Sequence, residues 1–160
     1  MKSSAWRGFI RGVGIFLVIA GSVMAFVYPF SHENLASVKQ ASAVLLSLAV
    51  NGPEETAGLG KNAADFISSM RENLGDRQMD EAYVDGVAVL VQFSSVGTNG
   101  LVFRLLLVER KELFVRAWNR QVSAETVEAA MAPQLAHYRK WTLGTFITMW
   151  STLGLGAVHI

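Results

Sequence analysis

Two stretches of the chain hold no charged residue, and they form the clearest pattern in the sequence. The first covers residues 12–30 (GVGIFLVIAGSVMAFVYPF) and the second covers residues 141–160 (WTLGTFITMWSTLGLGAVHI). A helix of 19 residues is about 29 Å long, which matches the ~30 Å hydrocarbon core of a bilayer. Both stretches are therefore predicted to be transmembrane helices.

The flanking residues predict how these helices are oriented. The segment 1–11 carries three basic residues and no acidic one, which favours the cytoplasmic side. Both termini are then cytoplasmic and the middle of the chain is extracytoplasmic, as in a multi-pass inner-membrane protein with a periplasmic domain. A signal peptide cleaved after Ala25 is an alternative for the first stretch. A buried amphipathic tail of the domain is the alternative for the second.

The residues between the two stretches, 31–140, are predicted to form one domain that begins with two helices. Pro29 should end the first membrane helix, and Ser31 should begin the next one. One apolar face then recurs at helical spacing up to Asn51-Gly52-Pro53, which ends that helix. A further helix is expected over 62–74, with Gly75 as its C-terminal cap.

From residue 82 the apolar period changes from 3.6 to 2, which is typical of β-strands. Asp85-Gly86 is predicted to be a hairpin turn. Apolar side chains then alternate up to Phe93. Gly97-Thr98-Asn99-Gly100 is predicted to be a turn, and further strands are expected over 101–108 and 113–118. A helix over 104–120 is the alternative.

A final helix is predicted to begin after Ser123, with Val122 and Val127 as a hydrophobic staple. Pro133 should kink or restart it before it runs into the second membrane stretch. The predicted fold class is an α+β membrane protein. Two transmembrane helices flank a small domain of two helices, a three- to four-stranded antiparallel meander and a further helix.

Charge and composition narrow the classes of function. Lys and Arg total 14 against 13 Asp and Glu, so no basic excess predicts nucleic acid as a partner. The absence of cysteine excludes a disulfide scaffold, a thiol nucleophile and any site built on cysteine ligands. All acidic residues lie between Glu33 and Glu128, within the predicted domain.

The chemical motifs of the chain are weak, so no catalytic residue, metal site or cofactor is predicted. The segment 58–63 (GLGKNA) matches a dinucleotide-binding spelling, but no strand precedes it. The acidic residues of 76–85 lack the spacing of a calcium loop. His32, His137 and His159 lack the spacing of a zinc site, although the first two could titrate at one membrane surface.

Small residues in the two membrane stretches predict close helix packing. They are Gly14, Gly21, Ala25, Gly144, Gly154 and Gly156. In the predicted sheet, Gln92, Arg104 and Arg116 would project from one face that could hold an anionic ligand or partner, or be the ordinary solvent side.

The leading functional hypothesis is a non-catalytic accessory or assembly subunit of a larger membrane protein complex. Its two spans would sit in the lipid bilayer and pack on the helices of integral membrane subunits, and its domain would dock on a partner. A membrane-anchored extracytoplasmic module that binds or senses a ligand is the alternative. In neither case is the protein expected to be an enzyme.

Overall fold

The structure is a computed structural model that describes residues 2–94 and 99–159, with side chains for 4–91 and 100–159. Of the described residues, 86% are helical. Its elements are α1 (Lys2–Asn51), α2 (Lys61–Leu74), α3 (Glu81–Ser94), α4 (Asn99–Arg104), the π-helix η1 (Leu105–Glu109), α5 (Lys111–Trp118) and α6 (Ala124–His159). They fall into two compact units. Unit 1 comprises Met1–Leu35 with Ala136–Ile160, and unit 2 comprises Ala36–Leu135.

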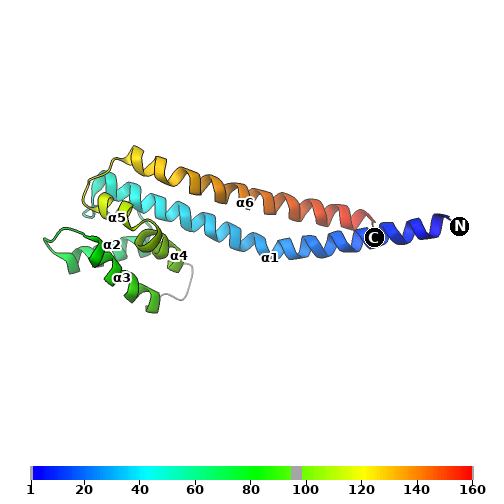
Figure 1. Cartoon of the computed structure of the whole chain (residues 1–160), viewed down its shortest axis with the longest axis horizontal. Coiled ribbons are helices and arrows are strands. Elements are labelled where there is room, and N and C mark those ends of the chain that lie inside the picture. Colours follow the sequence, from blue (N-terminus) through cyan, green and yellow to red (C-terminus); the bar gives the residue numbers. More distant parts are fainter. Residues whose placement is uncertain (1, 95–98, 160) are drawn as a thin grey trace. The chain divides into compact units, whose positions relative to one another are not determined.

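The predicted α+β fold is wrong, because the described residues hold no strand. Where the meander was expected, the chain forms α3, α4, η1 and α5 (Figure 1). Gly97 and Thr98, which were read as part of a turn, lie outside the described residues. Asn99 and Gly100 open α4.

Residues 81–94 form the helix α3 instead of the predicted hairpin, because the helix has an N-cap and a buried face. Asp80 caps the helix, since its Oδ1 accepts a hydrogen bond of 2.8 Å from the backbone N–H of Tyr83. Val84 and Ala88 are buried at a spacing of four residues, whereas Val89 is exposed. A short run that is apolar on every side fits a strand and a helix alike, so periodicity alone misassigned it.

The segment after α4 is the alternative helix that the sequence left open, interrupted by a π turn. Leu105, Leu106 and Leu107 are all buried, which three consecutive residues of a surface α-helix rarely are. The backbone N–H of Arg110 donates to the carbonyl of Leu105 at 2.8 Å, the five-residue spacing of a π-helix. This widened turn lets the leucine run enter the core before α5 begins.

The helix α1 is longer than predicted. It runs through Pro29 without a break, so the expectation that Pro29 ends the helix and Ser31 begins another is wrong. Proline removes one backbone donor and strains the preceding turn, a cost that a helix packed on a neighbour tolerates. The helix ends at Asn51 as predicted, where Gly52 has φ 74° and donates to the carbonyl of Leu48 at 2.9 Å.

The core of unit 2 is built around the end of α1. Val38, Ala41, Leu45 and Leu48 are buried on one face of α1, as the helical period predicts. The predicted helix after it is also confirmed as α2, whose Gly75 cap has φ 60°. Residues of α2, α3, α4, η1, α5 and α6 complete the core. The largest fully buried side chains among them are Phe114, Ile67, Leu105, Leu106, Leu107 and Met131.

The predicted start of α6 is confirmed in detail. The Oγ of Ser123 accepts a hydrogen bond from the backbone N–H of Thr126 at 3.2 Å. Val122 and Val127 are both buried, which fits the expected staple. The helix contains Pro133 and continues into the second charge-free stretch.

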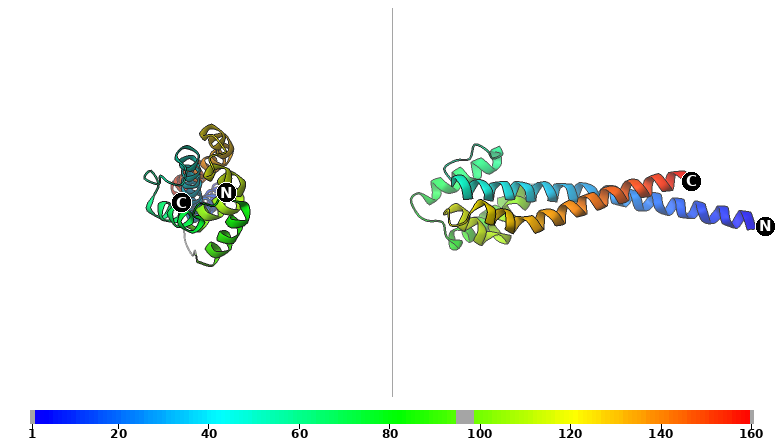
Figure 2. Two further views of the ribbon diagram at one scale, coloured as in Figure 1. Left: turned by 90° about the vertical axis from the view of Figure 1, so that its left-hand side faces the viewer. Right: turned by 90° about the horizontal axis from the view of Figure 1, so that it is seen from above.

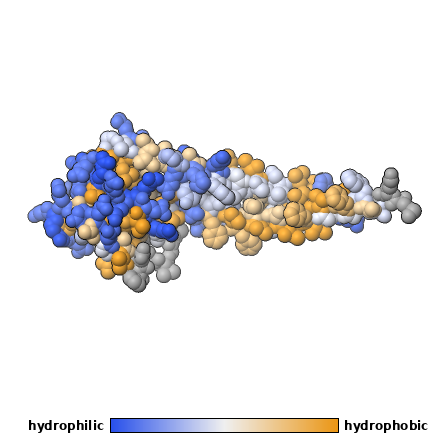
Figure 3. Space-filling model, viewed as in Figure 1, coloured by the Kyte–Doolittle hydropathy of each residue, from blue (hydrophilic) through white to orange (hydrophobic). Residues whose placement is uncertain are grey.

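Within the described residues, one helix is long and apolar enough, by length and composition, to cross a membrane. It is α1, whose qualifying helix spans Ser4–Asn51, and only 11% of its most apolar window is buried. The four threonines, one serine and three glycines of 141–160 dilute the apolar character of α6. The second span therefore stays a prediction. On the face shown in Figure 3, hydrophobic colour predominates along unit 1 and hydrophilic colour on unit 2.

Replacing Gly86 by Ala tests whether residues 81–94 form a helix. Gly86 lies inside α3, and a Cβ there would meet nothing within 4 Å. We expect Gly86→Ala to raise the free energy of unfolding by about 0.5–1 kcal/mol, because alanine favours a helix interior. Urea unfolding in mild detergent, followed by circular dichroism, measures the change.

Gly75→Ala is the matched control. Gly75 has φ 60°, a conformation that a Cβ strains, so the same substitution should destabilise the protein. A destabilising effect of Gly86→Ala would contradict the helix and favour the hairpin turn.

Candidate functional site

Unit 1 consists of an antiparallel helix pair, the α1–α6 pair, formed by residues 2–35 of α1 and 136–159 of α6. Figures 1 and 2 show these two parts side by side. An ideal Cβ on Gly14 would lie 3.1 Å from the Cβ of His159, and one on Gly21 would lie 2.6 Å from the Cγ of Leu153. The Gly14 distance is tighter than an ordinary Cβ contact, and the Gly21 distance would require the Leu153 side chain to shift, so the two glycines let the helices approach closely.

The predicted packing residues divide into two groups. Gly14, Gly21 and Gly156 are buried in the contact between α1 and α6. A Cβ on Gly156 would lie 2.9 Å from the carbonyl oxygen of Gly14. Gly144 and Gly154 adjoin open space, with nothing within 4 Å of an added Cβ, and Ala25 is exposed. The first group therefore packs the chain against itself.

Hydroxyl groups in the α1–α6 pair are satisfied by backbone carbonyls. The Oγ1 of Thr142 donates to the carbonyl of Ser31 at 3.1 Å, which joins the two helices. Thr145 and Thr152 donate to carbonyls of their own helix three and four residues back. Within the described residues, no buried side-chain nitrogen or oxygen lacks a hydrogen-bond partner. This bonding lowers the cost of placing these threonines in an apolar environment.

The opposite side of α1 carries a stripe of large apolar residues that faces away from α6. We call this stripe the outer seam. Its positions repeat at alternating spacings of three and four residues, and Gly12 is its one small member. The seven positions are Phe9, Gly12, Phe16, Ile19, Val23, Phe26 and Phe30. Its side chains are between 53% and 78% exposed. All four phenylalanines of α1 lie on this seam. The 3.5-residue period is that of a helix that packs along another helix.

The outer seam is the functional feature that the sequence analysis missed. The signal in the sequence is that Phe9, Phe16, Phe26 and Phe30 all fall on one line of a helix. The segment 12–30 is apolar on every side, so no polar face marks where this line lies.

Aromatic and basic residues gather where the first charge-free stretch ends and the second begins. The ring of Tyr28 lies 6.1 Å from that of His32 and 5.6 Å from that of Phe146. On α6, the ring of His137 lies 6.3 Å from that of Trp141. Tyrosine and tryptophan at the end of an apolar helical segment are typical of a membrane–water interface.

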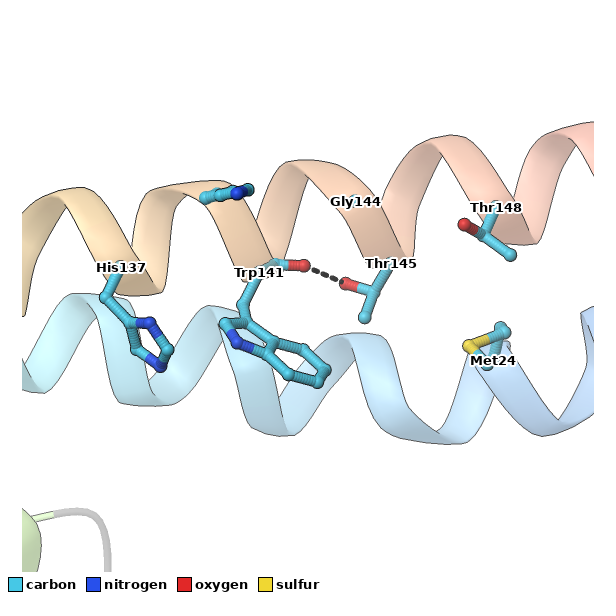
Figure 4. Close-up of a pocket in the computed structure, with 7 residues that line it drawn as sticks. Met24, His137, Trp141, Gly144, Thr145 and Thr148 are labelled. Carbon is cyan, nitrogen blue, oxygen red and sulfur yellow. Dashed lines mark hydrogen bonds between the residues drawn. The ribbon is translucent and has the colours of Figure 1, made fainter.

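A groove of about 510 Å³ opens along the α1–α6 pair (Figure 4). We call it the basic groove; its lining residues are Met24, His137, Lys140, Trp141, Gly144, Thr145 and Thr148. Figure 4 shows Met24 on α1 and the labelled residues of α6 along one side of that helix. The hydroxyl of Thr145 is occupied by the carbonyls of Trp141 and Thr142, so it offers no free proton to the groove.

The face predicted for Gln92, Arg104 and Arg116 has no sheet to support it. These residues lie on α3, α4 and α5, and the side chain of Gln92 lies outside the described residues. Arg104 faces Glu109 at 3.7 Å, whereas Arg116 donates to the carbonyl of Gln121 at 3.4 Å. The two arginines therefore have separate partners.

Three of the four acidic residues of 76–85 have structural partners. Asp80 caps α3, and Lys111 of α5 joins two more carboxylates, with its Nζ 2.9 Å from the Oδ1 of Asp85 and 3.4 Å from the Oε2 of Glu81. The hydrogen bond that Lys111 donates to Asp85 raises the pKa of Lys111 above its ordinary 10.5, and Glu81 adds to this, although partial desolvation opposes it. The hydrogen bond that Lys61 donates to Asp65 raises the pKa of Lys61 in the same way.

The remaining polar clusters also serve the fold. Arg77 donates to the carbonyls of Asn73 and Leu74, and Arg120 donates to the carbonyl of Asn51, so both cap the C-terminal ends of helices. Residues 58–60 form the loop before α2, consistent with its lack of a preceding strand. No group of three or more potential metal ligands is present in the described part of the chain.

A pair of cysteines tests the α1–α6 pair directly, because the chain has none of its own. We expect Gly14→Cys with His159→Cys to form an intramolecular disulfide under mild oxidation, since disulfides join Cβ atoms about 3.5–4.5 Å apart. Loss of reactive thiol and a shift on a non-reducing gel measure it. Gly12→Cys with His159→Cys is the control, because a Cβ on Gly12 meets nothing within 4 Å. Equal oxidation of both pairs would contradict the contact.

The bridge between α5 and α3 predicts a pH dependence. The raised pKa of Lys111 means that its stabilising contribution is fully present below pH 10.5 and is lost as the pH rises through the higher folded-state value. Lys111→Met should therefore slightly destabilise the protein at neutral pH, and the difference from the natural chain should shrink above pH 10.5. Urea unfolding at both pH values measures this, with Lys39→Met as the control. A difference that persists at high pH would contradict the assignment.

Compared with known proteins, the chain matches no protein-family model, no curated protein and no solved structure. Function is therefore inferred from the physical chemistry of the described residues.

Proposed function

We propose that the protein is a non-catalytic accessory or assembly subunit of a larger membrane protein complex. The α1–α6 pair packs on the helices of an integral membrane subunit, and the charged surface of unit 2 docks on the same complex. The observation that carries this proposal is the outer seam of α1, which is large, apolar, regularly spaced and uncovered by the chain itself.

Burial and spacing together favour a partner helix at the outer seam. Lipid alone accepts apolar residues on any side of a helix, and it requires no period. The outer seam instead repeats every 3.5 residues from Phe9 to Phe30, and it concentrates the phenylalanines on one line. Such a line lets side chains interlock with those of a second helix over about six turns. The contact with α6 lies on a different face of α1 and leaves this line open.

The proposal includes a second membrane span, formed by the part of α6 in unit 1. The bonded threonines and the direct Thr142–Ser31 link support it, because they remove much of the polar cost of that segment. The three basic residues of segment 1–11 favour cytoplasmic termini. The long domain between the two spans, unit 2, is then extracytoplasmic. The aromatic residues Tyr28 and Trp141 then lie at the outer interface.

Site-specific photo-crosslinking tests the outer seam. A photoreactive phenylalanine analogue in place of Phe16 should give a discrete adduct with another membrane protein in native membranes. The same analogue in place of Ile15, which is exposed but off the seam, should give several-fold less. Equal yields at both positions, or adducts only between two copies of this chain, would contradict the proposal.

Substitution of two isoleucines, one on the outer seam and one off it, tests how much the seam contributes to partner binding. Ile19 lies on the seam and is 58% exposed, whereas Ile15 lies off it and is 51% exposed. We expect Ile19→Ala to reduce co-purification of the partner about fivefold, the effect of losing ~1 kcal/mol of packing. Ile15→Ala should leave it unchanged. Quantitative mass spectrometry of the purified complex measures both, and an equal loss would contradict a specific seam.

A further inference from the structure

The basic groove combines an apolar interior with a cationic mouth. Met24, Gly144, Thr145 and Thr148 line the interior. His137, Lys140 and Trp141 lie at the other end of the groove, among the aromatic residues where the second charge-free stretch begins. From His137 to Thr148 the helix rises about 16 Å, which is close to the ~15 Å depth of one leaflet. The groove therefore matches a lipid in length.

The residues that line the groove include no acidic side chain. Arg139 and Lys140 are adjacent in α6, and no acidic residue follows Glu128 in the chain. On α1 the first acidic residue is Glu33, which does not line the groove. None of the ion pairs in the described residues involves Lys140. An ammonium group without a carboxylate partner at a membrane interface attracts an anionic headgroup.

The interior also has space for a chain. An added Cβ on Gly144 would meet nothing within 4 Å, so the glycine leaves a slot beside the α6 backbone. The hydroxyl of Thr145 is engaged by backbone carbonyls, which leaves its methyl group for contact. Figure 4 shows Trp141 and Thr145 projecting toward α1, with Met24 on the facing helix.

We propose that the basic groove binds one anionic phospholipid. The Nζ of Lys140 pairs with the headgroup phosphate, and the indole N–H of Trp141 and the imidazole of His137 supply further donors. One acyl chain lies along Met24, Gly144 and Thr148. This inference rests on the proposed membrane placement of α6, and it is independent of the partner at the outer seam. The lipid fills the hollow between the helices and holds the pair at the interface.

Native mass spectrometry of the purified full chain tests the headgroup site. The probes are phosphatidylglycerol and phosphatidylcholine with identical acyl chains, added to the protein in mild detergent. The natural chain should retain one phosphatidylglycerol in clear preference to phosphatidylcholine. Lys140→Gln should reduce that preference roughly fivefold, the effect expected for one cation near an anionic lipid surface. Arg139→Gln, which removes the neighbouring charge outside the groove, should leave most of it.

A second pair of variants tests the acyl slot. Gly144→Leu fills the groove and should lower retention of both lipids, whereas Gly154→Leu, at an equally open position outside the groove, should lower neither. Equal retention of the two lipids by the natural chain would overturn the proposal. It would also be overturned if the two charge variants, or the two leucine variants, behaved alike.

Labelling of a single introduced cysteine distinguishes an error in the proposed lipid site from an error in the proposed membrane placement of α6. Ser151→Cys lies in the middle of the proposed second span and should resist a membrane-impermeant maleimide in intact membranes. Resistance with no lipid preference would refute the groove alone. Rapid labelling would refute the second span and the groove together, while crosslinking at Phe16 would still report on the outer seam.

Discussion

The close approach of α1 and α6 is the constraint on which unit 1 depends. At Gly156 an added Cβ would lie 2.9 Å from the carbonyl of Gly14, and at Gly21 it would lie 2.6 Å from Leu153. In the proposed membrane placement, hydrophobic burial between the two helices contributes little, so close van der Waals contact and hydrogen bonds hold them together. The glycines permit that contact, and the bond from Thr142 to Ser31 fixes its register.

This contact assigns a separate role to each face of the helix pair. The face of α1 that carries Gly14 and Gly21 is covered by α6, so these two glycines are not available to a partner. The outer seam is then the face of α1 that remains for another helix. Beside the contact, Gly144 and Met24 leave the hollow that becomes the basic groove. A partner helix and an anionic lipid can therefore occupy different surfaces.

The sequence predicted those parts of the fold whose local signals agree with each other. The end of α1 at Asn51, the cap at Gly75 and the start of α6 at Ser123 each combine a period with a capping residue. The region 81–118 was misassigned because Val and Leu runs suit strands and helices equally, and the deciding contacts lie far apart in the chain. Small residues predicted close packing at Gly14 but did not identify α6 as the neighbour. The outer seam could be recognised only once the exposed face of α1 was known.

Purification of the tagged chain from native membranes in mild detergent, with mass spectrometry of the whole eluate, tests the central claim most directly. The account predicts one or more integral membrane proteins in fixed stoichiometry with the chain, and their identity would name the process. Recovery of the chain alone, intact and monodisperse, would contradict the assignment as a subunit.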